Sequence, residues 1–579
     1  MFRPTQEQQN AIELSQTVRR IKLSAAAGAA KTSTCVLIAE QNPVQSLYLA
    51  FNKTMADEAK DRFPPWVEVR TTHSLAYKAF GRQYAHKLSR PAGEYQNVGW
   101  TGSEVARMLH IPSQMIRSTK ENITASSIGC CVLATVARFE QSAEETLGPQ
   151  HVSLSPIPVK KTSRHDFPEK SIRKDVLECA KKLWERRVDL GSPVLISHDT
   201  YLKLYQLSKP DLSEYKMIYL DEYQDTNWCV HDIAMQQQHS GLVVVGDKFQ
   251  NIYGWRGAVN LMDKLEWPES SLSKSFRFGQ SVADLANEVL RENKTGAYRT
   301  SIVGFEDVDT EVLAAQEWFA KGKGDTVTTR IYRTNAHLIS DAIVDILAGN
   351  RVALQIDVKN FVRCLESGIA LKNGEKSKVK HDVFLGFDSW KEFKEEAEYD
   401  PECNKLYNII QGGEVYRILS TLRDYHPPKT YDVKYSTAHK MKGLEDDVVI
   451  LAEDFPSPLD KSGNWVGLSQ EEQNLLYVAL TRAKKVLVKN NTIEEILNYW
   501  QETCENVGGL SINVRDVRVI APGDFLETPL DKVVELEMAK MVGAVGLMSD
   551  LDHFVEGENL HPGDDHWQNM AIEFQGLPL

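Results

Sequence analysis

The sequence predicts an α/β protein whose strands form parallel sheets. Three segments of strand length, 20–24, 217–220 and 242–245, each lead directly into a run of small or polar residues, and the last two of these segments are apolar throughout. In open parallel sheets, ligands bind at the carboxyl ends of the strands. We therefore expect the three runs to meet at one edge of a sheet and to form one site.

The first run follows the strand 20–24 and opens a helix. Small residues allow backbone N–H groups to close around phosphates at a helix N-terminus, where the dipole favours anions. Lys31 would then reach the β- and γ-phosphates of ATP, and the Thr32 hydroxyl would bind Mg²⁺. Ala26 and Ala30 stand where glycines are common, and an alanine forced to positive φ costs roughly 1–2 kcal/mol. An alanine-rich helix start is the alternative. The residues expected to hold the nucleotide are Ala27, Gly28, Ala29, Ala30, Lys31, Thr32 and Ser33.

The second run, Asp221-Glu222, ends the strand 217–220. Two carboxylates suit a Mg-nucleotide, because one can hold the metal through water while the other polarises the attacking water. We assign the metal to Asp221, together with Thr32, and the role of general base to Glu222. A merely polar strand end is the alternative for this pair taken alone.

The third run follows the strand 242–245 and continues into an aromatic segment. Gln250 is placed to touch the γ-phosphate or the attacking water. Tyr253, Trp255 and Arg256 follow within a few residues, and an aromatic side chain there can stack on a base, which contributes roughly 1–3 kcal/mol per base. The short link from a phosphate sensor to a stacking platform favours nucleic acid as the ligand over the alternative, a core tryptophan with a surface arginine.

Length and the distribution of charge indicate a protein of several domains whose body can bind nucleic acid. The 579 residues predict roughly three to five domains. The net charge of −13 is concentrated in residues 501–579, which hold 15 acidic and 4 basic residues and leave residues 1–500 at −2. A nearly neutral body can carry basic grooves, because affinity for nucleic acid follows local phosphate contacts.

No membrane is expected as a partner, since no apolar run reaches the length of a membrane span and no signal peptide is present. The eight cysteines include no Cys-x-x-Cys pair. We therefore expect reduced thiols, no zinc or Fe–S cluster, and a cytoplasmic location, associated with the nucleoid in a prokaryote or phage.

Together these segments resemble the motifs of superfamily 1 helicases of the UvrD/Rep/PcrA type, in the same order. Further segments that carry the resemblance are 4–12, 50–53, 71–74, 275–277, 331–335, 436–445 and 475–484. The resemblance implies that Gln8 reads adenine, that Phe276 stacks near adenine and that Glu445 approaches the ribose.

The same resemblance implies a catalytic set and a set of DNA contacts. Arg277 and Arg482 would stabilise the transition state when two domains close on ATP. The catalytic set is Lys31, Glu222, Gln250, Arg277 and Arg482. The residues that would contact DNA are Phe51, Asn52, Thr72, His73, Tyr253, Trp255, Arg256, Thr437 and His439.

Within this superfamily, residues 1–490 are most similar to the F-box DNA helicase family, through the segments 51–59, 69–77 and 453–456. Because the motor begins by Pro4, we expect no F-box upstream. The ubiquitin-ligase partnership of the eukaryotic members is not carried over.

The resemblance implies two RecA-like P-loop motor domains with parallel sheets, each interrupted by an inserted subdomain, and an acidic C-terminal extension. The expected ranges are 1–85 and 197–270 for motor domain 1A, 86–196 for the helical insertion 1B, 271–350 and 431–500 for motor domain 2A, 351–430 for a short 2B-like insertion, and 501–579 for the extension. The stretch 160–187 carries ten basic residues against five acidic ones, and it predicts a phosphate-tracking surface or a solvated helix face.

The expected function is an ATP- and Mg²⁺-dependent motor that moves 3′ to 5′ along single-stranded DNA and unwinds 3′-tailed duplexes in recombination, repair or replication. Two alternatives stay open. The short second insertion is compatible with a translocase that strips proteins from DNA without unwinding. The alanines of the phosphate loop are compatible with a nucleotide-gated DNA-binding protein that hydrolyses ATP poorly. The acidic extension would dock a protein partner or only confer solubility.

Overall fold

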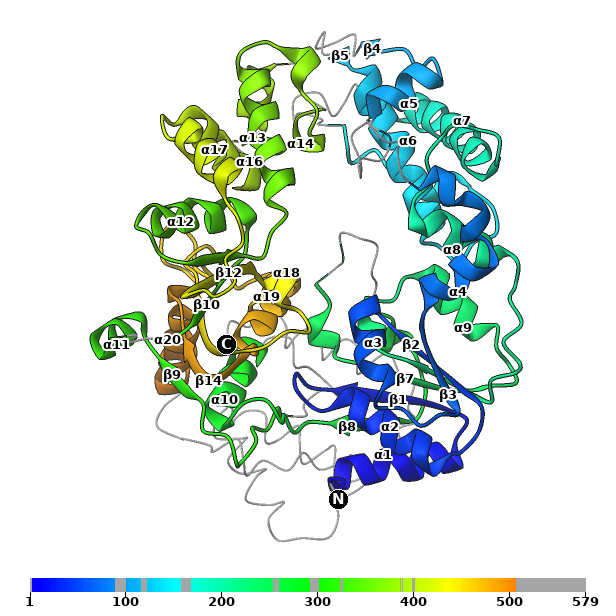
Figure 1. Ribbon diagram of the computed structural model, residues 1–579, viewed down its shortest axis with the longest axis vertical. Helices are drawn as coiled ribbons and strands as arrows, with labels where there is room; N and C mark the ends of the chain where they lie inside the picture. Colours follow the sequence, from blue (N-terminus) through cyan, green and yellow to red (C-terminus); the bar gives the residue numbers. More distant parts are fainter. Residues whose placement is uncertain are drawn as a thin grey trace, which may run out of the picture. The chain divides into compact units, whose positions relative to one another are not determined.

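The computed structural model describes residues 3–88, 100, 102–115, 122–157, 168–252, 254, 260–291, 301–322, 326–385, 387, 389–397 and 401–506. Those up to Glu502 belong to one compact unit. They contain two six-stranded sheets in which every strand pair is parallel (Figure 1). The predicted α/β fold with parallel sheets is therefore confirmed. Most of the acidic extension, from residue 507 on, lies outside the described residues.

The first sheet has the strand order β3-β2-β6-β7-β1-β8. Its strands are β1 (Arg20–Ala25), β2 (Ser46–Ala50), β3 (Val67–Thr71), β6 (Met217–Leu220), β7 (Gly241–Gly246) and β8 (Glu269–Leu272). Its helices are α1 (Gln6–Thr17), α2 (Lys31–Gln41), α3 (Lys53–Lys60), α4 (Thr72–Ala79), α8 (His198–Leu207) and α9 (Trp228–Met235), with the 3-10 turns η1 (Gly81–Lys87), η4 (Tyr223–Asp225), η5 (Lys248–Gln250) and η7 (Leu261–Lys264). The central strands are continuous apolar runs because helices cover both faces of a parallel sheet. We call this the first α/β domain.

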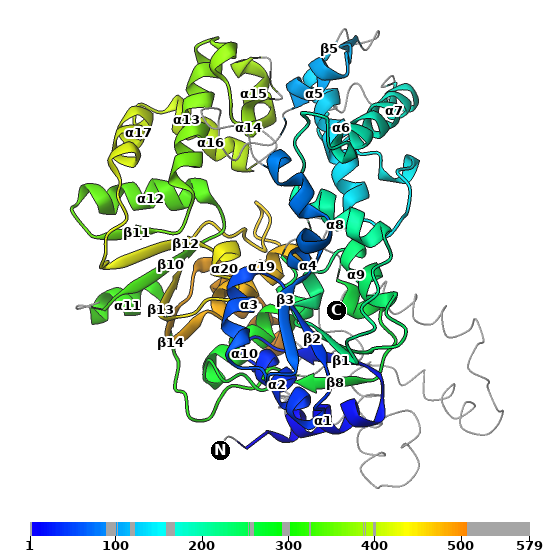
Figure 2. The same ribbon diagram turned by 45° about the vertical axis from the view of Figure 1, so that its right-hand side comes forward.

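The second sheet has the order β11-β12-β10-β13-β14-β9, and Figure 2 shows its first five strands side by side. Its strands are β9 (Glu311–Leu313), β10 (Thr328–Tyr332), β11 (Val352–Leu354), β12 (Val433–Thr437), β13 (Asp446–Leu451) and β14 (Ala483–Val488). Its helices are α10 (Gln280–Val289), α11 (Ala315–Lys321), α12 (Asn335–Leu347), α18 (Ala438–Met441), α19 (Gln470–Leu480) and α20 (Asn491–Asn506). We call this the second α/β domain. Since β11 pairs with β12, this strand belongs to the sheet although it lies in the range 351–430.

Each domain is interrupted by a mainly helical insertion. The first contains α5 (Gly102–Met108), α6 (Ala125–Glu140), α7 (Glu169–Val188), the turn η2 (Pro149–His151) and a short antiparallel pair, β4 (Gln114–Met115) and β5 (Asn122–Ile123). The second contains α13 (Val358–Lys372), α14 (Asp382–Leu385), α15 (Trp390–Ala397), α16 (Pro401–Gln411), α17 (Val415–Asp424) and the turn η10 (Lys376–Lys378). Helix α7 exposes the basic residues Lys170, Lys174, Lys181 and Lys182, while its apolar positions pack in the core of the insertion. Among the described helices, none is both long and apolar enough to cross a membrane.

The register of the first sheet gathers three loops at one edge. Ser24 of β1 pairs with Gly246 of β7, and Leu220 of β6 pairs with Val244 of β7. The carboxyl ends of these strands are therefore neighbours. The loop that precedes α2, the carboxylates after β6 and the polar run after β7 all start from this edge.

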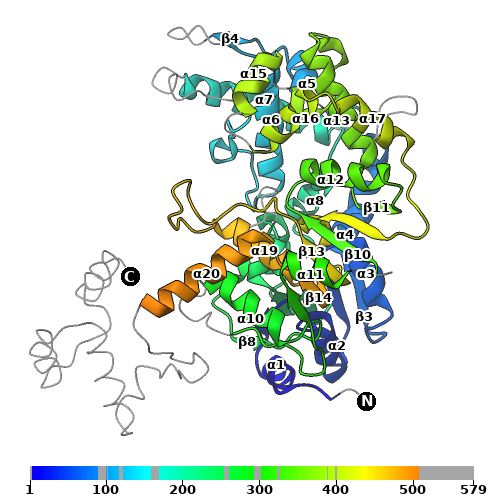
Figure 3. The ribbon, with the colours of Figure 1, turned by 90° about the vertical axis from the view of Figure 1, so that its left-hand side faces the viewer.

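Helix α19 joins the two domains. It packs beside α10, as Figure 3 shows, and one apolar cluster contains α10, α19 and residues of the first domain, among them Ala27, Phe249 and Ile252. The ends of β1 and β7 are thus in direct contact with the second α/β domain.

Candidate active site

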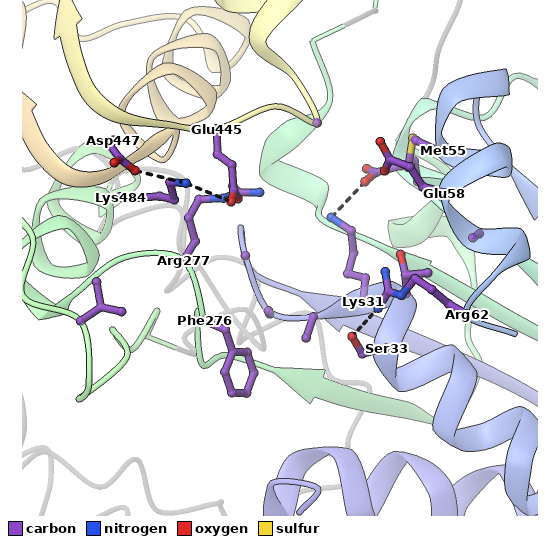
Figure 4. A pocket seen from close by; sticks show the side chains of 18 of the residues that line it. Lys31, Ser33, Met55, Glu58, Arg62, Phe276, Arg277, Glu445, Asp447 and Lys484 are labelled. Carbon is purple, nitrogen blue, oxygen red and sulfur yellow. Dashed lines mark hydrogen bonds and ion pairs between the residues drawn. The ribbon is translucent and has the colours of Figure 1, made fainter. Parts of the chain in front are cut away.

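A cavity of about 780 Å³ opens where the two domains meet. Figure 4 shows Lys31, Ser33 and Arg62 on the side of the first domain. Arg277 and Lys484 line the opposite side. The residues of the first and second predicted runs that line the cavity are Gly28, Ala29, Ala30, Lys31, Thr32, Ser33 and Glu222.

The loop before α2 needs one glycine and contains one strained alanine. Gly28 has φ +73°, and a Cβ there would lie 2.5 Å from the Ser275 hydroxyl and 2.9 Å from Cβ of Arg277. Ala30 has φ 55° and ψ 40°, in the left-handed region, whereas Ala26 has no positive φ. Of the two alanines that depart from the glycine pattern, only Ala30 carries backbone strain.

The carboxylate pair after β6 lies directly opposite the loop lysine. Nζ of Lys31 is 3.2 Å from Oε1 of Glu222. Burial acts to raise the pKa of Glu222, but Lys31, Lys442 and a hydrogen bond from Gln224 lower it to about 2. Burial acts to lower the pKa of Lys31, but Glu222 and two further carboxylates raise it. Glu222 is therefore an ionised carboxylate held by a buried cation.

Asp221 lies next to the loop threonine. Its Oδ2 accepts hydrogen bonds from the Thr32 hydroxyl at 3.3 Å and from the Tyr48 hydroxyl, and its Oδ1 accepts from the backbone N–H of Glu222. Burial and the charge of Glu222 raise the pKa of Asp221. A hydroxyl and a carboxylate at the cavity edge form an oxygen-only donor set, which is what Mg²⁺ prefers. Thr32 and Asp221 therefore fit the predicted magnesium ligands.

Gln250 does not line the cavity. It is buried, and its Nε2 donates to Oδ2 of Asp247 at 2.7 Å. The backbone carbonyl of Gln250 accepts a hydrogen bond from Nζ of Lys442, which also pairs with Asp225. The loop after β7 is thus tied to the second domain by a buried lysine.

The two predicted arginines differ in access. Arg277 lines the cavity, and its Nε donates to Glu445 at 2.7 Å. Arg482 is buried: its Nε donates to the carbonyl of Val478, and burial together with the charge of Arg277 lowers its pKa to about 9. Of the two arginines, therefore, only Arg277 lines the cavity.

Of the side chains expected around the nucleoside, some line the cavity and others are buried away from it. Phe276 and Glu445 line the cavity. Gln8 is buried in α1, where its Nε2 donates to the Thr34 hydroxyl at 3.1 Å and its Oε1 accepts from the N–H of Thr5. Ala27, which is part of the phosphate loop, is also fully buried.

The sequence analysis did not assign three cations that line the cavity, Lys484, Lys485 and Arg62. Nη2 of Arg62 donates to the Ser33 hydroxyl at 2.7 Å. Of the cations that line the cavity, Arg62 alone forms no ion pair with a described carboxylate, since Lys31 and Arg277 pair with glutamates and Lys484 and Lys485 pair with Asp447. Part of the signal was present, because Met55, Glu58 and Ala59 recur at the spacing of one face of α3, and Arg62 follows two residues after the end of this helix.

The predicted DNA contacts lie on both domains. In the first domain, Asn52 caps α3 by accepting a hydrogen bond from the N–H of Met55, and Phe51 is 39% exposed. Thr72 is buried at the start of α4, and Nε2 of His73 lies 3.1 Å from Oδ1 of Asp199.

In the second domain, Thr437 is buried where α18 begins, and Nε2 of His439 is 3.2 Å from the carbonyl of Ile252. Burial lowers the pKa of His439. Tyr253, Trp255 and Arg256 lie outside the described residues.

Comparisons with known proteins agree with this geometry. Residues 4–265 match the family model of the UvrD/REP helicase N-terminal domain, and residues 196–490 match that of the UvrD-like helicase C-terminal domain. F-box DNA helicase protein 1 of Schizosaccharomyces pombe is 32% identical over 518 residues, which cover 82% of this chain and 56% of that protein. F-box DNA helicase 1 of Gallus gallus is 29% identical over 513 residues, or 82% and 48% of the two chains.

A more distant relative is the ATP-dependent DNA helicase PcrA of Leuconostoc citreum, which is 26% identical over 205 residues, or 34% of this chain and 25% of that protein. The chain spans about half the length of the two F-box relatives.

Proposed function

The chain belongs to the UvrD-like helicase family, and from this premise we propose that it is an ATP-driven motor that moves 3′ to 5′ along single-stranded DNA. One observation carries the proposal: the phosphate loop, Glu222 and Arg277 surround a single cavity between two α/β domains. A cavity with a loop on one side and a cation on the other responds to the γ-phosphate by closing, and closure is the step that moves a strand. DNA as the track follows from the family and from the printed names of the relatives.

The chemistry we propose is in-line attack of water on the γ-phosphate. Thr32 and Asp221 would hold Mg²⁺, which when bound supplies positive charge against the phosphates. Glu222 orients the attacking water and accepts its proton. For Lys31 to reach the phosphates, its ion pair with Glu222 must break, which frees the Glu222 carboxylate to bind the attacking water. As a positioned base, the carboxylate accepts the proton that the water loses.

The arginines would act in sequence. Arg277 already faces the cavity, whereas Arg482 must exchange its bonds to Val478 and Leu444 for the γ-phosphate. That exchange requires movement of the second domain toward the first, so full charge stabilisation is available only in the closed state. We propose that Arg62 binds the same phosphates from the side of α3, because it is the cavity cation that has no described carboxylate partner. Gln250 would sense the γ-phosphate from behind, Phe276 would stack on adenine, and Glu445 would bind the ribose.

DNA would cross both domains. Phe51, Asn52, Thr72 and His73 would hold the strand on the first domain, with Thr437 and His439 on the second. Tyr253, Trp255 and Arg256 would supply the stacking contact. For the domains, we propose the ranges given above for 1A, 1B, 2A, 2B and the extension. We further propose that the natural substrate is 3′-tailed duplex DNA in recombination, repair or replication. The proposed location is cytoplasmic.

The test is steady-state ATP hydrolysis with and without single-stranded DNA, beside a Glu222→Gln variant. We expect strong stimulation by DNA, and we expect the variant to bind ATP and lose at least about a hundredfold in kcat, because a positioned base contributes roughly 10²–10⁴-fold. Binding of ATP and DNA without stimulated turnover would favour the nucleotide-gated binding protein, for which the strained Ala30 is the motivating observation.

A translocase that strips proteins without unwinding is the second candidate. The observation behind it is the second insertion, whose described helices run only from Val358 to Asp424. A forked duplex with a 3′ tail separates the two functions: strand separation supports the helicase, whereas displacement of a bound protein without strand separation supports the translocase.

A further inference from the structure

A tyrosine hydroxyl of the second domain connects two loops of the first. Tyr477 lies in α19, five residues before Arg482, and its side chain is fully buried. The hydroxyl accepts a hydrogen bond from the backbone N–H of Ala27 at 2.9 Å and donates one to Oδ2 of Asp247 at 3.0 Å. Ala27 belongs to the phosphate loop, and Asp247 follows β7. One phenol therefore bridges the phosphate loop after β1 and the loop after β7.

The connection continues to the proposed general base. The N–H of Asp247 donates to Oε1 of Gln224 at 3.0 Å, and Nε2 of Gln224 donates to Oε2 of Glu222. Gln224 fits there only because residue 246 is glycine: a Cβ on Gly246 would lie 2.4 Å from Oε1 of Gln224. An unbroken, buried chain of hydrogen bonds thus runs from the phosphate loop to Glu222.

The phenol acts through hydrogen bonds and shape. Burial, and next the charge of Asp247, raise the pKa of Tyr477 well above its ordinary value, so the hydroxyl stays protonated. One turn earlier on α19, Nδ2 of Asn474 donates to the carbonyl of Asn251 at 2.9 Å. Helix α19 is therefore seated on the loop after β7 by two polar side chains.

We propose that Tyr477 is a positioning residue for ATP hydrolysis. Its hydroxyl sets the arginine-bearing helix α19 in register with the phosphate loop and, through Asp247 and Gln224, with Glu222. The inference rests on the proposed motor function. Hydrolysis needs base, loop and arginine in one geometry, and a displacement of about 1 Å costs roughly a hundredfold in rate.

The test is Tyr477→Phe, which removes the hydroxyl and keeps the ring. Tyr435→Phe is a matched control, because Tyr435 is also fully buried in the second domain, accepts from Arg330 at 2.9 Å and donates to the carboxylate of Asp345 at 2.6 Å. Both variants lose the same kind of bridge and should show similar falls in melting temperature. Only Tyr477→Phe should lose about tenfold or more in DNA-stimulated kcat, with KM for ATP within about threefold of the wild type.

Asp247→Asn tests the same hydrogen-bonded bridge from the side of the residue that accepts the bond from Tyr477. If Tyr477 acts through Asp247, the kcat losses of the two single variants should not multiply in the double variant. A kcat for Tyr477→Phe within about twofold of the wild type, or an equal loss in Tyr435→Phe, overturns the inference. If Tyr477→Phe does not fold, a normal kcat in Asp247→Asn overturns it. Wild-type protein that DNA does not stimulate instead overturns the motor function itself.

Discussion

Ala30→Gly is expected to stabilise the protein, although glycine usually destabilises. Ala30 adopts φ 55° and ψ 40° as the cap of α2. An L-residue in this region costs roughly 1–2 kcal/mol, which glycine removes. Against this, glycine adds roughly 0.4–1 kcal/mol of unfolded-chain entropy. The difference is centred on a gain of roughly 0.8 kcal/mol, within a range of about 0–1.6 kcal/mol, and the central value corresponds to an increase in Tm of about 2–3 °C for a domain of this size.

Ala26→Gly is the matched control for this prediction. Ala26 lies in the same loop and is half-buried like Ala30, but it has no positive φ. Glycine there brings the entropic cost of roughly 0.4–1 kcal/mol and also removes a methyl that packs against two apolar clusters, so we expect a net loss of stability. Thermal unfolding followed by circular dichroism, without nucleotide, measures both variants. A lower Tm for Ala30→Gly, or equal shifts in the two variants, would refute the strain argument.

Two further predictions concern the cavity and its surroundings. Arg62→Ala should raise KM for ATP roughly tenfold or more, because a hydrogen bond to a charged group contributes about 1.5–3 kcal/mol. Lys60→Ala, which removes an exposed cation paired with Asp57, is the control and should leave KM unchanged. Equal effects of the two substitutions on KM would contradict the proposal that Arg62 binds the phosphates. Burial raises the pKa of Asp225 to about 7 although Lys442 lowers it. Since the folded pKa lies above the unfolded value of roughly 4, the carboxyl loses stabilisation as pH rises between these values. The Tm of the wild type relative to Asp225→Asn should therefore fall as the pH is raised from about 4 to about 7, and a difference that does not change with pH would argue against this shift.

Much of the site was predictable from local patterns. A strand that ends in a small-residue loop with Lys31-Thr32, and another that ends in Asp221-Glu222, predict the edge of a parallel sheet, because such edges bind ligands in α/β proteins. The structure brings these loops together through the adjacent strands β1, β7 and β6. The position of each run directly after a predicted strand was sufficient to predict that the runs lie together.

The orientation of single side chains was not predictable. Gln8, Gln250 and Arg482 do not line the cavity, because each has a buried hydrogen-bond partner that the linear sequence does not reveal. The same holds for Tyr477, whose partner Ala27 lies 450 residues earlier in the chain. Backbone conformation was equally hidden, since Ala26 and Ala30 are the same residue type in one loop and only one is strained.

The strand order of the first sheet has a consequence during synthesis. The phosphate-loop strand β1 ends at Ala25, yet its two sheet neighbours are β7, which starts at Gly241, and β8, which starts at Glu269. At roughly 5–20 residues per second, β1 waits roughly 10–40 s on the ribosome before its first neighbour exists. Throughout that interval an apolar strand is exposed without a pairing partner, and such strands recruit other chains. The nascent protein should therefore depend on chaperones that shield its N-terminal segment until the first insertion has been translated.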